Sequence, residues 1–270
     1  MPLIRVRDTE LYYEDTGGSG PVVMFSHGLL WSGRMFAAQV DALRDRYRVI
    51  TYDHRGQGRS APPTERSVPI ETVTEDAAAL IEALGVAPVH FVGLSMGGFV
   101  GMRLAARRPE LLRTLTLLET TADPEPAENV PKYRRLAFVA GNLGLWLVAG
   151  PVMKIMFSRS FLTDPTRKAD VAHWRAALLE NRRDIVAAVY GVVEREGCAE
   201  LLPRIKLPTL VMVGEEDVAT VPAKAERIQA GIVGSRLVRI PAAGHSSSVE
   251  NPGPINAELR AFLEGNPGTP

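Results

Sequence analysis

The sequence predicts an α/β fold with a mostly parallel, doubly wound sheet that carries an inserted helical segment. Short apolar runs bounded by Gly and Pro alternate with longer runs of helical periodicity as far as Leu118. Each parallel pair of strands needs a crossover connection, so this alternation favours a parallel sheet. The alternation stops after Thr121 and resumes at Thr209. We therefore expect a core domain formed by residues 1–121 and 203–270, and a helical cap formed by residues 122–202.

Composition and charge exclude several classes of protein. The 270 residues are 46% apolar and 23% charged, which is typical of a globular chain. The 31 basic and 31 acidic residues balance, so no overall field attracts a nucleic acid, and none is expected as a partner. The single Cys198 cannot form an internal disulfide, and the first residues lack an apolar leader pattern. A cytoplasmic location is the expectation; oligomeric state is not predicted.

The first strands are expected to form an antiparallel edge. Leu3–Arg7 and Leu11–Glu14 alternate apolar and polar residues, and Gly17–Pro21 ends the pattern. The following strands of the core are expected at Val22–Phe25, Val49–Tyr52, Val89–Gly93, Thr114–Leu118, Thr209–Val213 and Arg236–Ile240. The helices between and after them are expected at Gly33–Arg46, Ile70–Leu84, Met96–Arg107, Ala223–Ala230 and Pro254–Leu263.

An apolar stretch inside the insertion is long enough to resemble a membrane span. Leu136–Phe157 contains Asn142, Pro151, Lys154 and several glycines, which argue against a span. We expect two short apolar helices packed over the core and no stable membrane association, with a membrane-attached lid as the lesser alternative. Their inner faces are expected to line an apolar substrate pocket. The candidate residues are Phe138, Leu145, Trp146, Met153, Met156 and Phe157.

The strongest chemical signal is a G-x-S-x-G sequence at a strand-to-helix junction. Gly93-Leu94-Ser95-Met96-Gly97 follows a predicted strand and begins a predicted helix. A nucleophilic serine must project from a tight turn, where glycines on either side leave room for the backbone. The start of the helix also favours a developing oxyanion. Ser95 is therefore the predicted nucleophile.

A serine needs a histidine base and a carboxylate to become reactive. His245 follows the last predicted strand, and Asp217 follows the strand Thr209–Val213, so both lie where catalytic groups gather in open α/β sheets. The chain order of the three residues matches that of G-x-S-x-G hydrolases. Glu119 is the alternative acid, at the end of the strand before the insertion. His90 and His173 are expected to be structural, whereas His54 lies in a loop after an earlier strand.

An oxyanion hole requires two backbone N–H groups that point at one position. Met96, next to the nucleophile, is expected to supply one of them. The loop after Val22–Phe25 is expected to supply the other through Leu29, with Leu30 as the alternative. Leu30 is also a candidate substrate-binding residue. His27 is expected to brace this loop.

These residues together resemble the α/β-hydrolase family. The resemblance rests on His27-Gly28, Asp53-His54-Arg55-Gly56-Gln57-Gly58-Arg59-Ser60, the turn at Ser95, Asp217 and Gly244-His245, and it covers nearly the whole chain. The segments Asp217–Pro222 and His245–Pro252 are most similar to the 3-oxoadipate enol-lactonases and related esterases. The resemblance implies the α/β-hydrolase fold and catalysis by Ser95, His245 and Asp217.

The expected activity is hydrolysis of a carboxylic ester or lactone through an acyl-enzyme, without a cofactor or metal. Similar dehalogenases and epoxide hydrolases carry aspartate at the position of Ser95, so the serine argues against both activities. Perhydrolysis, C–C bond hydrolysis, acyl transfer to another acceptor and a non-catalytic ligand receptor stay open. The substrate is expected to be a small molecule. The basic cluster Lys132, Arg134, Arg135, Arg182 and Arg183 could contact a polar or anionic substituent of it.

Overall fold

The computed structural model describes residues 2–267, and its core is an eight-stranded sheet. The strands lie in the order β1-β2-β4-β3-β5-β6-β7-β8. The pairs β1/β2 and β2/β4 are antiparallel, and all other neighbours are parallel, as the alternation of strand and helix predicted. The strands are β1 (Leu3–Val6), β2 (Thr9–Asp15), β3 (Val22–Ser26), β4 (Arg48–Tyr52), β5 (Val89–Leu94), β6 (Leu112–Leu118), β7 (Thr209–Gly214) and β8 (Arg236–Ile240).

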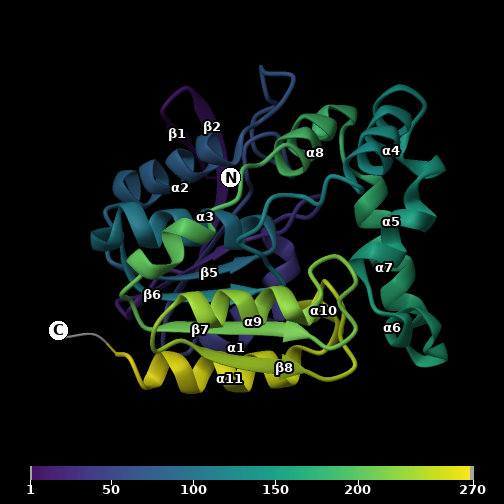
Figure 1. Cartoon of the computed structure of the whole chain (residues 1–270). Helices are drawn as coiled ribbons and strands as arrows, with labels where there is room; N and C mark the ends of the chain where they lie inside the picture. Colours follow the sequence, from purple (N-terminus) through teal and green to yellow (C-terminus); the bar gives the residue numbers. More distant parts are fainter. Residues whose placement is uncertain (1, 268–270) are drawn as a thin grey trace.

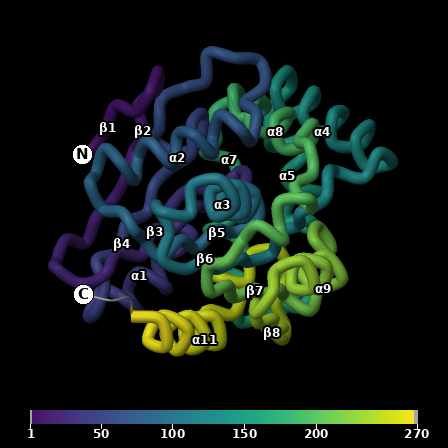
Figure 2. Tube along the Cα trace, turned by 60° about the vertical axis from the view of Figure 1, so that its left-hand side comes forward, coloured from purple at the N-terminus to yellow at the C-terminus, as the bar shows by residue number. Residues whose placement is uncertain are grey.

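Helices cover both faces of this sheet. The core helices are α1 (Ala37–Leu43), α2 (Ile70–Leu84), α3 (Met96–Arg107), α9 (Pro222–Gly231), α10 (Ser247–Glu250) and α11 (Pro252–Glu264). Helices α2 and α3 lie on one face, whereas α1 and α11 pack together on the other (Figures 1 and 2). The predicted bounds of α2, α3 and β8 agree with the structure, and those of most other core elements differ by one to three residues.

The inner strands are buried on both faces, which explains their continuous apolar sequences. Successive side chains of a strand point to opposite faces. Met24 of β3 and Phe91 of β5 pack in the hydrophobic cluster with α2 and α3. Phe25 and Val92, the next residues, pack in the cluster that contains residues of α1 and α11. The sheet therefore joins two hydrophobic cores.

The chain between β6 and β7 is helical. Its helices are α4 (Val130–Asn142), α5 (Ala149–Met156), α6 (Arg159–Thr163), α7 (Lys168–Leu179) and α8 (Val186–Val193). Figure 1 shows these helices beside the end of the sheet toward which the β7 arrow points. They therefore lie near the carboxyl ends of the parallel strands, where loops carry functional groups in such sheets. Within residues 2–267, no helix is both long enough and apolar enough to cross a membrane.

Candidate active site

Ser95 occupies a strained turn between β5 and α3. Its φ of 52° and ψ of −108° are rare for a residue with a side chain. The neighbouring backbone lies so close to Gly93 and Gly97 that neither position has room for a side chain. A Cβ at Gly93 would overlap the Gly97 carbonyl, and a Cβ at Gly97 would overlap the Ser26 carbonyl. The Ser95 N–H donates to the Leu118 carbonyl at 2.8 Å. The turn is thus held in place, with the Ser95 hydroxyl projecting from it.

The three predicted residues of the triad lie in hydrogen-bonding contact. The distance from Ser95 Oγ to His245 Nε2 is 2.9 Å, and the distance from His245 Nδ1 to Asp217 Oδ2 is also 2.9 Å. All three residues are buried. They come from the turn after β5, the loop after β7 and the loop after β8, so the parallel sheet brings together residues that are 150 positions apart in the chain.

Asp217 is held as an ionised acceptor. Its Oδ1 accepts hydrogen bonds from the backbone N–H groups of Ala219 and Thr220 at 2.8 and 3.0 Å, and its Oδ2 accepts one from Thr220 Oγ1 at 2.7 Å. Burial acts to raise the pKa of Asp217, but His245 and these donors outweigh it and keep that pKa below its ordinary value. A carboxylate in this state can orient the imidazole of His245 with its proton on Nδ1.

Glu119, the alternative acid, does not contact His245. It directly follows β6 with a φ of 42°, and its Oε1 accepts the Gly214 N–H at 3.1 Å, while its Oε2 has no hydrogen-bond partner in the described part of the chain. Burial raises the pKa of Glu119 well above its ordinary value. Its geometry, together with the raised pKa that favours the uncharged carboxyl group, does not suit the orientation of an imidazolium.

Backbone N–H groups are available beside Ser95. Met96 begins α3, where the first N–H groups have no partner within the helix. The Leu30 N–H donates to Gln57 Oε1 at 3.0 Å and is therefore engaged, whereas no acceptor among residues 2–267 engages the Leu29 N–H. The structure thus favours Leu29 over Leu30 as the second donor. A Cβ at Gly28 would come within 2.9 Å of Leu94 Cδ2, so glycine lets this loop approach the Ser95 turn.

Two buried histidines and Gln57 brace the same loop. His27 Nδ1 contacts the Gly28 carbonyl at 2.7 Å, and its Nε2 accepts the His54 N–H at 2.9 Å. Burial lowers the pKa values of both rings, so they stay neutral at pH 7. Gln57 Nε2 contacts Met96 Sδ at 3.3 Å, and Gln57 therefore connects the loop to the start of α3. From the sequence, Gln57 has no predicted individual role, although it lies in the Asp53–Ser60 segment that carries the family resemblance.

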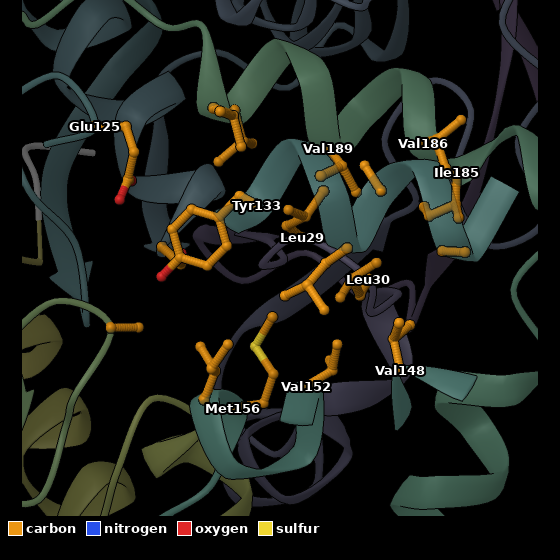
Figure 3. A pocket seen from close by; sticks show the side chains of 18 of the residues that line it. Leu29, Leu30, Glu125, Tyr133, Val148, Val152, Met156, Ile185, Val186 and Val189 are labelled. Atoms are coloured by element: carbon orange, nitrogen blue, oxygen red, sulfur yellow. The ribbon is translucent and has the colours of Figure 1, made fainter. Parts of the chain in front are cut away.

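A mostly apolar cavity of about 130 Å³ adjoins Ser95 and His245. The insertion contributes most of its wall. On α4 the lining residues Tyr133, Leu136, Ala137 and Ala140 follow helical spacing. Three sequence candidates, Leu30, Leu145 and Met156, also line it. Figure 3 shows Leu30 and Met156 within this pocket.

Other sequence candidates lie elsewhere. Phe138 and Trp146 are 60% and 64% exposed and do not line the cavity, which corrects the expectation. Phe138 follows Ala137 and is turned about 100° around α4, away from the pocket side. Met153 and Phe157 are buried but lie outside the lining, and Phe157 stacks on Phe161 with ring centroids 4.9 Å apart. The basic cluster also lies outside it.

The two remaining histidines are remote from the nucleophile. His90 is buried in β5, where its Nδ1 contacts Thr114 Oγ1 at 2.9 Å. His173 lies on α7 at a second hollow, which Trp31 and Arg182 also line. Among residues 2–267, no group of three or more His, Cys, Asp or Glu side chains is arranged to hold a metal.

The comparison with known proteins identifies the family. A model of the alpha/beta hydrolase fold matches residues 21–148. The candidate carbamate hydrolase RutD of Azorhizobium caulinodans is 30% identical over 276 residues, which cover 97% of this chain and 98% of RutD. The chain belongs to the alpha/beta hydrolase family.

Solved structures resemble this alpha/beta hydrolase over its whole length. A thermophilic esterase from Thermogutta terrifontis superposes with a TM-score of 0.91 at 29% identity, covering 99% of this chain and 100% of the esterase. The enol-lactonase from Burkholderia xenovorans LB400 superposes with a TM-score of 0.90 at 30% identity, covering 97% of this chain and 100% of the lactonase. The hydrolase thus shares the complete fold, insertion included, with enzymes that are named for cleaving esters or lactones.

Proposed function

We propose that this alpha/beta hydrolase is a serine hydrolase that cleaves a carboxylic ester or lactone through an acyl-enzyme. The observation that carries the proposal is the pair of 2.9 Å contacts that join Ser95 Oγ to His245 and His245 to Asp217. Such a series of contacts activates a hydroxyl group that is otherwise unreactive at neutral pH. The names of the esterase and the enol-lactonase support the same bond type.

Each residue has one role in the proposed reaction. Ser95 Oγ attacks the carbonyl carbon while His245 Nε2 accepts its proton, and Asp217 stabilises the resulting imidazolium. The N–H groups of Met96 and Leu29 bind the oxyanion, at about 3 kcal/mol of transition-state stabilisation per donor. The tetrahedral intermediate collapses, and His245 returns the proton to the leaving alkoxide. Water then attacks the acyl-enzyme by the same steps and releases the acid; in a lactone, acid and alcohol leave as one molecule.

The insertion is proposed to act as a cap that selects the substrate. Residues 122–202 supply most of the pocket wall, and their lining side chains are mainly aliphatic. A wall of this kind favours an acyl or alkyl group with apolar surface. Carbamate hydrolysis by the same triad is a second candidate, because several RutD proteins align with at least nine-tenths of the chain.

A substrate panel tests the proposal. We expect hydrolysis of p-nitrophenyl butyrate or of at least one lactone, with a higher kcat/KM than that for a matched aryl carbamate. Ser95→Ala should abolish this activity, whereas Ser67→Ala, at a half-buried position outside the pocket, should leave it unchanged.

Unchanged hydrolysis in Ser95→Ala, or no turnover of any ester or lactone, would contradict the proposal. A preference for the carbamate would favour the second candidate. Turnover only with hydrogen peroxide or with a C–C substrate would favour perhydrolysis or C–C bond hydrolysis. Binding without turnover would favour a receptor, and acyl transfer to an added alcohol would favour a transferase.

A further inference from the structure

The polar side chains of the pocket wall other than Ser95, Thr220 and His245 gather at one end. Figure 3 shows Glu125 and the Tyr133 hydroxyl together on one side of the pocket, with Val148, Ile185 and Val186 on the opposite side. Arg195 also lines the cavity. Burial of charged groups beside aliphatic side chains is costly unless they are paired. We therefore expect Glu125, Tyr133 and Arg195 to have a function other than packing.

Glu125 and Arg195 form a buried ion pair that leaves donors unused. Arg195 Nη1 contacts Glu125 Oε2 at 3.1 Å, and their side chains are 3% and 14% exposed, respectively. Glu125 Oε1 accepts a hydrogen bond from Asn129 Nδ2 at 3.0 Å, so both carboxylate oxygens have partners. In contrast, Arg195 Nε is buried without a partner, and its Nη2 engages no acceptor within residues 2–267.

Tyr133 adds a further donor. Its hydroxyl has no hydrogen-bond partner among the described residues, and the ring lines the pocket. Burial, together with Glu125, raises the pKa of Tyr133, so the phenol keeps its proton at neutral pH. Arg195 Nε has almost no accessible surface, so the donors that the polar end presents are the Tyr133 O–H and Arg195 Nη2, beside a charge pair that is already balanced.

We infer that Tyr133, Arg195 and Glu125 form a subsite for an uncharged oxygen of the substrate, such as a keto, hydroxyl or ester carbonyl oxygen. This inference rests on the proposed function and defines its substrate class as esters or lactones with a second, neutral oxygen besides the scissile carbonyl. An oxygen acceptor can accept hydrogen bonds from the Tyr133 O–H and from Arg195 Nη2. A carboxylate is disfavoured, because the charge of Arg195 is already neutralised by Glu125, which would repel a second anion.

Two matched pairs of esters test whether the subsite binds an oxygen of the acyl group or an oxygen of the alcohol group. One pair is p-nitrophenyl hexanoate and p-nitrophenyl 5-oxohexanoate; the other is the butyrate esters of hexan-1-ol and 5-oxohexan-1-ol. In at least one pair, the parent enzyme should show about tenfold higher kcat/KM for the oxo ester, which corresponds to one charge-assisted hydrogen bond. Tyr133→Phe should reduce this preference at least threefold with little change for the alkyl ester. Tyr190→Phe, on α8 outside the lining, should preserve the preference.

A second variant tests the charge argument. Glu125→Gln removes the partner of Arg195 and should increase the relative kcat/KM for p-nitrophenyl hydrogen glutarate, which carries a terminal carboxylate, at least fivefold. Thermal unfolding checks that Glu125→Gln is folded. If it is not folded, the result for Tyr133→Phe tests the subsite without it. Equal rates within both oxo/alkyl pairs, an equal loss for oxo and alkyl esters in Tyr133→Phe, or a preference of the parent for the carboxylate ester would overturn the inference.

Binding measurements separate this inference from the proposed function. In Ser95→Ala, the dissociation constant of the preferred oxo ester should be several-fold lower than that of its alkyl partner, and the added substitution Tyr133→Phe should remove the difference. This result would support the subsite even if the parent enzyme hydrolysed no ester. Equal dissociation constants in Ser95→Ala, together with normal ester hydrolysis by the parent, would overturn the subsite alone.

Discussion

Asparagine in place of Asp217 should lower kcat/KM for p-nitrophenyl butyrate by about 10⁴-fold, or about 5.5 kcal/mol of transition-state stabilisation. The structure gives the reason. Asp217 Oδ1 accepts two backbone N–H groups, so the asparagine oxygen should occupy that position and the amide nitrogen should replace Oδ2. The amide N–H would then face His245 Nδ1 at about the present 2.9 Å. It would stabilise the tautomer with a proton on Nε2, which cannot accept the proton of Ser95.

Glu119→Gln is the matched control for this substitution. Burial raises the pKa of the Glu119 carboxyl group well above its ordinary value and so favours the neutral form, and glutamine has nearly the shape of a neutral glutamic acid. Its kcat/KM should therefore stay within about threefold of the parent value, since no group that contacts the substrate changes charge. Initial rates for both variants at pH 7 and pH 8, with circular dichroism to check folding, provide the test. A larger loss in Glu119→Gln than in Asp217→Asn would show that the wrong acid has been assigned.

Two further substitutions test the support of the site, and a third tests a buried histidine of the core. Gln57→Ala removes the acceptor of the Leu30 N–H and should lower kcat about five- to tenfold with a smaller change in KM; an unchanged kcat would contradict the bracing role. In Gly97→Ala, the added Cβ would overlap the Ser26 carbonyl, so the free energy of unfolding in urea should fall by about 3 kcal/mol. A variant as stable as the parent would show that close packing at this position does not require glycine. Burial lowers the pKa of His90 to about 4. Because the unfolded chain takes up this proton near pH 6.5, the free energy of unfolding should fall by about 3 kcal/mol between pH 6.5 and pH 4. His90→Asn should flatten this dependence, and equal pH profiles for variant and parent would contradict it.

The sequence predicts much of the core because local and long-range requirements agree there. Strands such as β5 are buried on both faces, so their residues form continuous apolar runs between turn residues. The turn at Ser95 combines a strand end, a helix start and glycines that close packing requires. The positions of Asp217 and His245 follow from the rule that parallel strands end at the same edge of the sheet.

The pocket wall was harder to predict, because apolar composition does not identify the face of a helix. Phe138 was expected to line the pocket, but Tyr133, Leu136 and Ala140 on the same helix do so. The helical spacing of these three residues would have indicated the correct face once the bounds of α4 were known. Glu125 and Arg195 are 70 positions apart, and neither lies in a local motif. Their pairing depends on tertiary structure and could not be predicted from the sequence.

The most direct test of the central claim is labelling with a fluorophosphonate probe, followed by peptide mass spectrometry. Such probes react with serines that a neighbouring base has activated. We predict one label per chain, attached to Ser95, and no label in Ser95→Ala. We also expect labelling to be slowed strongly in Asp217→Asn and little in Glu119→Gln. An unlabelled parent protein, or a label on another serine, would contradict the activation of Ser95 by His245 and Asp217.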